Sequence, residues 1–227
     1  MRGRFFYRII DGEFIPGPLI RGIIVTLQLA GVSSVMAILI GAFTAIGRMS
    51  NSIAGRLIAT TYLEIIRNTP LLVQLFMFYF VLAPIFEIDR FWAGVLCLAA
   101  FEGSFAAEII RGGIQAVERG QYEAADATGL SKFDKYRYVI VPQALPLILP
   151  PLTGLLISLI KHSAIVSVIA VAELTTEGLN LISDTYMAFE IWFIVAGMYL
   201  VLTTSLSVLV NILEVRMNKS RKKKKSK

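Results

Sequence analysis

Three ionisable side chains of this sequence fall inside long apolar stretches, where charged groups are costly. Glu102 stands near the middle of the stretch 91–110, and Lys161 and His162 stand late in the stretch 145–170, followed by Ser163. Ionisable residues at membrane depth mark pathways for substrates or ions, so these four polar residues are candidates for lining one. A Glu102–Lys161 ion pair that only joins two packed helices is an equally good interpretation, because intramembrane charges also pair with one another.

A second group of polar residues lies in the stretch EAADATGLSKFDKYRYVIVPQALP, which runs from residue 123 to residue 146. The first part favours a helix that Gly129 ends, and Ser131 is suited to cap a second helix, which Pro142 would stop. Such an amphipathic hairpin is either a docking surface for a partner or an ordinary charged loop. Lys135 and Arg137 would form one face, and the other face would hold Ala124, Ala125, Leu130, Phe133 and Tyr136.

The elements that would position these residues are membrane helices. The 227 residues are 56% hydrophobic and 17% charged, which is far from the balance of a soluble domain. No segment alternates as a membrane strand would, so we predict an all-α membrane protein with about five transmembrane helices. A bilayer core of about 30 Å needs roughly 20 apolar residues per helix, and the candidate segments are 19–46, 67–85, 91–110, 145–170 and 190–213.

Arginine and lysine collect in alternate loops. They gather in residues 48–56, in 111–137 and in the basic tail 215–227, whereas the loops around 87–89 and 173–184 are acidic. Positive residues mark the cytoplasmic side, which predicts an external amino terminus, a cytoplasmic hairpin and a cytoplasmic carboxyl terminus. The tail is expected to be disordered and to lie against anionic lipid, an explanation that we prefer to nucleic-acid binding.

The amino terminus opposes this topology, because it carries Arg2, Arg4 and Arg8. The other loops agree with one another, so we keep the assignment. Residues 1–18 are interpreted as an interfacial segment in which the stretch RFFYRIIDGEF forms a helix on the outer surface.

The second candidate span is irregular. Its apolar run after Pro70 has only about 15 residues, which is short for a crossing. Residues 52–68 are therefore interpreted as an interfacial helix that leads into it, and Pro70 breaks or kinks the chain at the boundary. Together with Arg67 and Thr69, this proline could form a gate or hinge near the cytoplasmic mouth, or it could be a plain kink at a helix start.

The spacing in the hairpin matches a known pattern: Glu-Ala-Ala, three residues, Gly, nine residues, and an apolar-x-apolar-Pro sequence. It resembles the coupling loop of membrane subunits in ATP-binding-cassette (ABC) importers. The similarity covers residues 22–214 and indicates the branch that takes up polar amino acids of the His, Glu, Gln and Arg type, with the type I importer fold. Other stretches that resemble this branch are EIIRNTPLLVQLFMFYF, AAEIIRGGIQAVERGQYEAA, VIVPQALPLILPPL and KHSAIVSVIAVAEL.

The resemblance implies a non-hydrolytic pore subunit of a bacterial inner-membrane importer. Residues 19–214 would form the permease domain and residues 113–144 its coupling loop. Two permease subunits, identical or related, would sit on two ATPase subunits, and an external binding protein would deliver the substrate. The sequence contains no phosphate-binding loop of the G-x-x-x-x-G-K-[ST] type, so ATP and Mg²⁺ would be held by the partner ATPase and no cofactor by this chain.

The resemblance also assigns roles within the hairpin. Its first helix would dock into a cleft of the ATPase and transmit rigid-body movement to the pore. The small residues Ala124, Ala125 and Gly129 would allow a close approach, Glu123 would act as an anchor or as a charge at the helix start, and Pro142 would close the pattern.

An amino acid carries one ammonium and one carboxylate, so a pore with Glu102 on one wall and Lys161 or His162 on the other could hold both ends. Histidine after this lysine departs from the acidic or amide residue that is usual in the family. A lone histidine is more often a packing residue than a ligand. If His162 faces the pore, its protonated form would favour an anionic substrate, and its neutral form would donate a hydrogen bond.

Two other classes of protein remain as alternatives. A self-contained secondary transporter or channel would often show inverted repeats, and five spans do not divide into two repeats. A membrane enzyme would need a nucleophile, a base and an oxyanion donor, or a set of metal ligands. We find neither in a sequence with one cysteine and one histidine.

Overall fold

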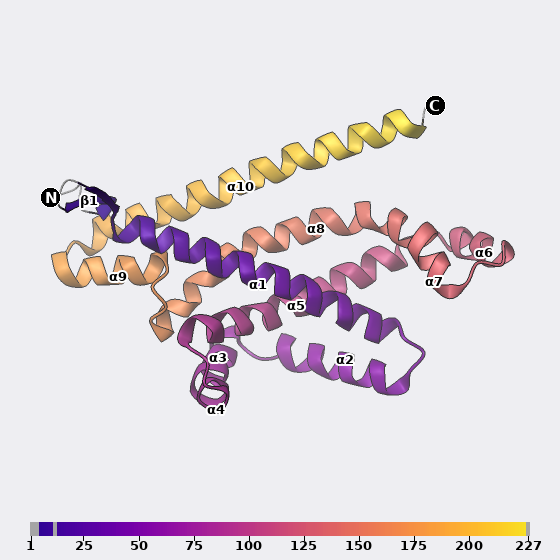
Figure 1. Ribbon diagram of the computed structural model, residues 1–227, viewed down its shortest axis with the longest axis horizontal. Coiled ribbons are helices and arrows are strands. Elements are labelled where there is room, and N and C mark those ends of the chain that lie inside the picture. Colours follow the sequence, from indigo (N-terminus) through magenta and orange to yellow (C-terminus); the bar gives the residue numbers. More distant parts are fainter. Residues whose placement is uncertain (1–4, 11–12, 226–227) are drawn as a thin grey trace. The chain divides into compact units, whose positions relative to one another are not determined.

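The computed structural model describes residues 5–10 and 13–225, and it describes their side chains except at 7–10, 13–15 and 213–225. Apart from one pair of strands, this part of the chain is helical (Figure 1). The elements are β1 (Tyr7–Ile10), β2 (Glu13–Pro16), α1 (Pro18–Met49), α2 (Ile53–Arg67), α3 (Leu71–Phe76), a π-helix (Met77–Leu82), α4 (Ala83–Phe86), α5 (Arg90–Gln115), α6 (Arg119–Ala127), α7 (Lys132–Asp134), a second π-helix (Lys135–Ile140), α8 (Val141–His162), a 3₁₀-helix (Ser163–Ile169), α9 (Leu174–Thr185) and α10 (Ala188–Lys225).

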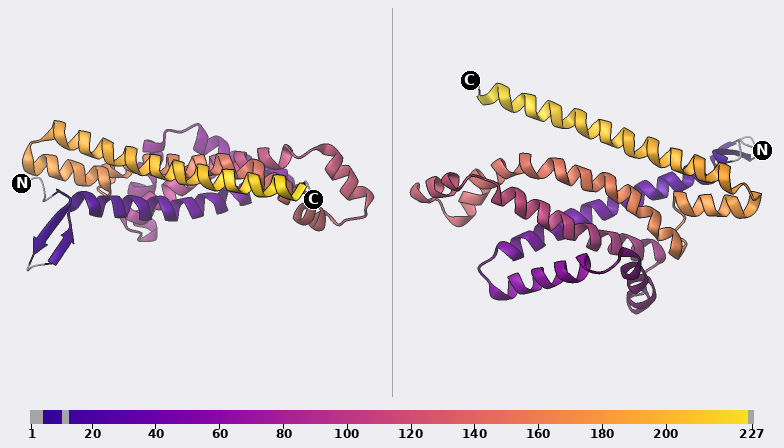
Figure 2. Two further views of the ribbon diagram at one scale, coloured as in Figure 1. Left: turned by 90° about the horizontal axis from the view of Figure 1, so that it is seen from above. Right: turned by 180° about the vertical axis from the view of Figure 1, so that it is seen from behind.

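Residues 7–10 and 13–16 form a pair of strands, so the helix predicted for the stretch RFFYRIIDGEF is wrong. Strands β1 and β2 pair antiparallel, with Tyr7 opposite Pro16 and Ile10 opposite Glu13. Figure 2 shows the two strands side by side before α1. The sequence between them is Asp11-Gly12, which is a favoured connection for a two-residue hairpin. Asp-Gly favours a turn and disfavours a continuous helix, so it is the sequence signal that the helix prediction neglected. Arg2 and Arg4 lie outside the described residues.

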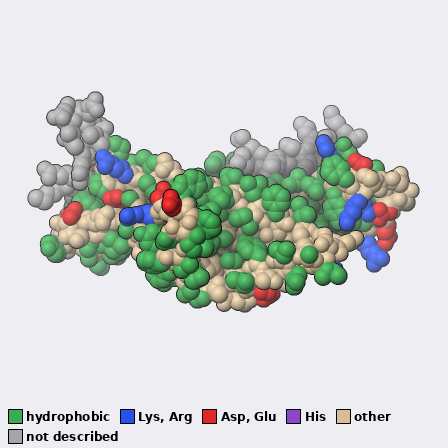
Figure 3. Space-filling model, turned by 60° about the horizontal axis from the view of Figure 1, so that its bottom comes forward, with side chains coloured by type: hydrophobic (Ala, Val, Ile, Leu, Met, Phe, Trp, Pro, Cys, Tyr) green, Lys and Arg blue, Asp and Glu red, His purple; other side chains and the backbone are tan. Residues whose placement is uncertain are grey.

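The predicted spans are confirmed. Among the described residues, four helical segments are long and apolar enough to cross a membrane, and a bent pair of helices makes up to five. The bent pair coincides with the irregular second span. On the face shown in Figure 3, hydrophobic side chains cover broad areas and charged side chains gather in a few groups. The four segments are Pro18–Met49, Arg90–Gln115, Lys132–Ile169 and Ala188–Ile212.

The chain breaks at Pro70 as predicted. Helix α2 ends at Arg67 and α3 begins at Leu71, with Pro70 in an extended conformation (φ −63°, ψ 136°) as its N-cap. The pair Ile53–Arg67 and Leu71–Phe86 is bent by 107°. A proline disfavours helical conformation in the residue before it, so the helix ends where the sequence predicts.

The chain divides into two compact units. Unit 1 consists of residues 1–34, 70–98 and 156–227, and unit 2 of residues 35–69 and 99–155. In unit 1 the start of α1 packs against α9 and α10. Gly22 permits this, because a Cβ there would lie 2.8 Å from the backbone Cα of Leu174. The apolar core of this unit contains Phe5, Leu19, Leu174, Leu181, Ile191 and Val195.

A buried carboxyl group organises the same core. Glu173 is fully buried, and its side chain caps α9 by accepting hydrogen bonds from the backbone N–H groups of Thr175 (2.9 Å) and Thr176 (2.8 Å). The Tyr199 hydroxyl of α10 donates to the same carboxyl group at 2.7 Å. The hydroxyl oxygen of Thr26 in α1 accepts from the Leu174 N–H at 3.2 Å. These bonds tie three helices together around the start of α9.

Unit 2 is built on close contacts between helices. A Cβ on Gly41 of α1 would lie 2.6 Å from the Ala106 Cβ of α5, and one on Gly113 of α5 would collide with Ile148 of α8. Helix α2 joins the same packing, because the Tyr62 hydroxyl donates to the Ala100 carbonyl at 2.5 Å. Its position relative to a membrane surface stays a prediction.

Helix α10 continues to Lys225, so the disorder predicted for the basic tail is not found up to that residue. Lysine and arginine are good helix formers, and the tail follows an existing helix without a glycine or proline that would end it. Residues 226–227 lie outside the described part.

Candidate functional site

The first leg of the hairpin is helix α6, which ends as the sequence predicts. Gly129 has φ +74°, the left-handed conformation that favours glycine. Its N–H donates to the Asp126 carbonyl at 3.0 Å, and the Leu130 N–H donates to the Ala125 carbonyl at 3.3 Å. These bonds satisfy carbonyl groups at the helix end, so the turn is a built C-cap.

The second leg starts at the predicted cap but does not stop at Pro142. The Ser131 hydroxyl oxygen accepts from the Asp134 N–H at 3.2 Å, which confirms its role as N-cap. The chain then runs through the π-helix Lys135–Ile140 into α8, which includes Pro142. A π-turn is wider than an α-turn, so it leaves space for the proline ring. Proline has no N–H, and the wider turn lets the carbonyl group that would have bonded to it tilt outward. The predicted helix end at Pro142 is therefore wrong.

Polar and aromatic contacts join the two legs. The Lys135 ammonium pairs with the Asp126 carboxylate at 2.5 Å. The rings of Tyr122 and Tyr136 meet edge to face, with centroids 6.4 Å apart. Burial raises the pKa of the Tyr122 phenol, and the neighbouring Tyr136 adds to this. The hairpin is thus an ordered element that its own side-chain contacts hold together, and its role as a docking surface stays a prediction.

The hairpin is also attached to the helices that it connects. The Tyr122 hydroxyl donates to the Ile114 carbonyl near the end of α5 at 2.8 Å. The Gln143 amide of α8 donates to the Gln121 side chain at 3.0 Å. These two bonds attach α6 to the end of α5 and to the start of α8.

The exposed face of α6 differs in one residue from the predicted one. Ala125 is only 4% exposed, so its side chain is not on the exposed face. Glu123 and Ala124 are exposed, as are Thr128 and Gly129 at the turn. Glu123 forms an i,i+4 pair with Arg119 at 2.9 Å, and both side chains are mostly in solvent, so this pair contributes little stability. The face is small and open, which suits close approach by another surface.

The second leg carries an aromatic face that the sequence placed differently. Phe133 and Tyr138 are 68% and 64% exposed. The Arg137 guanidinium lies over both rings, 5.7 Å from the Phe133 centroid and 5.5 Å from the Tyr138 centroid. Lys135 and Tyr136 are half-buried against the first leg instead of lying on opposite exposed faces. The alternation fails because the π-helical turn changes the angle between successive side chains.

The candidate pathway residues lie in different units. Glu102 is 2% exposed in the part of α5 that belongs to unit 2, whereas Lys161, His162 and Ser163 belong to unit 1. Lys161 is exposed, His162 is half-buried, and the fully buried Ser163 donates its hydroxyl to the Ile160 carbonyl at 2.7 Å. That bond gives Ser163 a structural role at the end of α8. The pairing of Glu102 with Lys161 or His162 stays a prediction.

The candidate hinge residues lie at the bend between α2 and α3. Arg67 sits over the Phe105 ring, 5.5 Å from its centroid. The Asn68 amide donates to both the backbone and the side chain of Glu64 at 2.8 Å. The Thr69 hydroxyl donates to the Ile65 carbonyl at 2.8 Å. These bonds satisfy the end of α2, so the bend is ordered, and a gating role stays a prediction.

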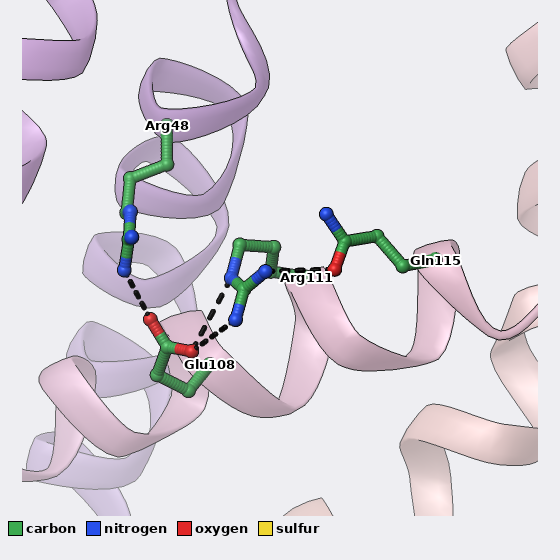
Figure 4. Close-up of polar contacts among 4 residues, drawn as sticks. All are labelled: Arg48, Glu108, Arg111 and Gln115. Atoms are coloured by element: carbon green, nitrogen blue, oxygen red, sulfur yellow. Dashed lines mark hydrogen bonds and ion pairs between the residues drawn. The ribbon is translucent and has the colours of Figure 1, made fainter.

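A polar cluster lies around Glu108 near the end of α5, and the sequence spacing predicts only one of its contacts. The i,i+3 pair of Glu108 and Arg111 is present, with Nη2 of Arg111 2.6 Å from Oε2 of Glu108. Arg48 at the end of α1 binds the other carboxylate oxygen, also at 2.6 Å. Figure 4 shows both guanidinium groups pointing toward Glu108, with Gln115 beyond Arg111. Arg48 is 60 residues away in sequence, so local spacing gives no signal for it.

The described residues contain no group of three or more histidine, cysteine, aspartate or glutamate side chains that could hold a metal ion.

Comparison with known proteins identifies the family to which this architecture belongs. Residues 37–219 match the family described as binding-protein-dependent transport system inner membrane component. This chain belongs to that family. It is therefore a multi-pass inner-membrane component of a binding-protein-dependent transport system, as the hairpin pattern predicted.

Relatives match over most of their length. The chain is 38% identical over 202 residues to the glutamine transport system permease protein GlnP of Escherichia coli K12, covering 88% of this chain and 92% of the relative. It is 41% identical over 164 residues to the probable glutamine ABC transporter permease protein GlnM of Bacillus subtilis, covering 72% and 76%.

Solved structures agree. An amino acid ABC transporter crystallised with histidines matches with a TM-score of 0.82 and 43% identity, over 88% of this chain and 94% of that one. An inward-facing MetNI methionine ABC transporter matches with a TM-score of 0.69 and 23% identity, over 89% and 95%, which supports the fold alone. The predicted type I importer permease fold is confirmed.

Proposed function

We propose that this chain is the membrane-spanning subunit of an ABC importer and forms the translocation pathway for a polar amino acid, with glutamine as the first candidate. One observation carries the proposal: the match at 43% identity and TM-score 0.82 to an amino acid ABC transporter over 88% of the chain. The curated relatives named as glutamine permeases support the choice of glutamine.

The partners follow from the same proposal. Two ATPase subunits hold ATP and Mg²⁺, an external binding protein delivers the amino acid, and a second permease subunit, identical or related, completes the pore. The exposed face of α6 supports the ATPase contact, because Ala124, Thr128 and Gly129 leave the backbone open to a partner surface.

The orientation is part of the proposal. The hairpin charges Arg119, Lys132 and Arg137 are exposed, as expected for a segment in the positively charged cytoplasm-facing loops. The amino terminus and α9 then lie on the outer side, and the carboxyl-terminal end of α10 lies inside. Glu102, Lys161 and His162 remain the proposed polar groups of the pathway.

Reconstitution tests the function. The chain is co-expressed with an ATPase subunit and a permease partner and placed in proteoliposomes with a receptor that binds glutamine. We expect uptake of labelled glutamine that requires ATP on the ATPase side and receptor on the other, with weaker uptake of acidic and basic amino acids. Vesicles with an ATPase variant that cannot hydrolyse ATP are the control. Glutamine accumulation by the permease chain alone would instead indicate a secondary transporter, and the proposal would be wrong.

Crosslinking tests the docking face. The chain has one cysteine, Cys97, which is buried, so a cysteine introduced in the hairpin is the reactive one. We expect a photoreactive maleimide on Ala124→Cys or Thr128→Cys to capture the ATPase. Ala125→Cys is the matched control, because this adjacent position is buried and should label slowly. Efficient capture from Glu87→Cys, in an acidic loop, with none from positions 124 and 128, would place the ATPase elsewhere.

A further inference from the structure

The cluster of Arg48, Glu108, Arg111 and Gln115 joins α1 to α5, close to the point where the chain enters the hairpin (Figure 4). Each oxygen of the Glu108 carboxylate binds a different arginine: Oε1 binds Arg48, and Oε2 binds Arg111 through Nη2 at 2.6 Å and Nε at 3.2 Å. Arg111 also donates to Gln115, the last residue of α5, at 2.7 Å. One carboxylate therefore connects the end of α1 to the last turns of α5.

The three charged side chains are partly buried, with exposed fractions of 31% for Arg48, 24% for Glu108 and 28% for Arg111. Water screens such a cluster only in part, and charge-assisted hydrogen bonds of this length are directional. Arg111 donates two hydrogen bonds, from Nε and Nη2, to one oxygen of Glu108. Arg48 uses a single N–H, so a point charge at that position could replace it.

Within unit 2, α1 also contacts α5 through small apolar residues. Gly41 of α1, two turns before Arg48, lies against Ala106 and the Ala107 backbone of α5, next to Glu108. Apolar contacts hold the two helices close, but they are not directional, so they constrain sliding and rotation of the helices less than a charge-assisted hydrogen bond does. The ion pair of Arg48 with Glu108 adds a directional bond between the two helices.

The hairpin is hydrogen-bonded to the same part of α5. The Tyr122 hydroxyl of α6 is bonded to the Ile114 carbonyl, next to Gln115. A movement of α6 therefore reaches Ile114, then the turn that carries Arg111 and Glu108, and then Arg48 on α1. All these residues belong to unit 2, so the path lies within one compact body.

We propose that Glu108 is a positioning residue that locks α1 to α5 and so transmits hairpin movement to the pore. The proposal rests on the proposed function, because it needs an ATPase that moves the hairpin. Without the lock, the hairpin and the end of α5 would move while α1 lags, and ATP would be hydrolysed with less transport.

The test measures glutamine uptake and ATP hydrolysis together in proteoliposomes of the complete complex. For Glu108→Gln and for Arg48→Gln, we expect the ratio of uptake to hydrolysis to fall by about fivefold or more, the range of ordinary coupling between sites. The double variant should fall no further than the single ones, because all remove one link. Arg48→Lys should keep most of the ratio, whereas Arg111→Lys should lose it.

Arg56→Gln is the matched control: it removes an exposed arginine of α2 that lies outside this cluster, and it should leave the ratio unchanged. The amount of assembled complex and its melting temperature are measured for each variant. The proposal is overturned if the Gln variants keep the wild-type ratio, or if uptake and hydrolysis fall together in step with assembly. A wild-type complex without receptor-stimulated hydrolysis would contradict the proposed function instead.

Discussion

Replacing Gly129 by valine is expected to abolish most transport while the protein still inserts and assembles. Gly129 has φ +74°, and a β-branched residue in that region is strained by about 1–2 kcal/mol or more. A Cβ there meets nothing within 4 Å inside the chain, so packing of the subunit itself is not disturbed. The effect falls on the angle between the legs and on the surface offered to the ATPase. We expect uptake to fall at least about tenfold, with basal ATP hydrolysis retained.

Two further variants separate the reasons for this loss. Asparagine tolerates the left-handed conformation, so Gly129→Asn keeps the turn but adds bulk at the partner face. Transport by Gly129→Asn close to the wild-type level would assign the valine effect to the turn, and a loss equal to that of valine would assign it to close approach. Gly120→Ala, a glycine of α6 with open space and no positive φ, is the control and should transport normally. Wild-type uptake by Gly129→Val would contradict the coupling role of the hairpin.

Replacing Glu173 by leucine is expected to destabilise unit 1 strongly. The buried carboxyl group accepts from the N–H groups of Thr175 and Thr176, from the Thr176 hydroxyl and from the Tyr199 hydroxyl, and leucine leaves these donors without this acceptor. Each buried donor that loses its partner costs about 1–3 kcal/mol, so we expect a loss of about 3 kcal/mol or more in the free energy of unfolding. The two tryptophans, Trp92 and Trp192, lie in unit 1, so their fluorescence during thermal unfolding in detergent measures the loss.

A graded series makes this prediction sharper. Tyr199→Phe removes one donor together with its bond and should cost about 1 kcal/mol. Glu173→Gln should lie between the two, because its amide nitrogen faces a donor instead of accepting from it. Glu190→Gln, which changes an exposed glutamate at the start of α10, is the control and should melt like the wild type. Equal melting temperatures for Glu173→Leu and Glu190→Gln would show that the capping network is dispensable.

Local chemistry made much of this protein predictable. The spans follow from apolar length, because a bilayer leaves no other place for such stretches. Gly129, Ser131 and Pro70 act on the backbone of their own neighbours, so the turn, the cap and the break could be read directly. The same holds for the pair of Glu108 and Arg111, which are one helical turn apart. The order of motifs along the chain then indicated the family.

Long-range packing settled the rest. The bond from Arg48 to Glu108 joins residues 60 positions apart, and Ala125 is buried although its neighbours Ala124 and Asp126 are exposed. Pro142 continues a helix because a π-turn precedes it. The bond from Tyr199 to Glu173 and the bond from the Leu174 N–H to Thr26 form only when α10 and α1 meet the start of α9. A sequence pattern reports the interactions that a residue makes within a few positions, whereas these contacts depend on which helices meet.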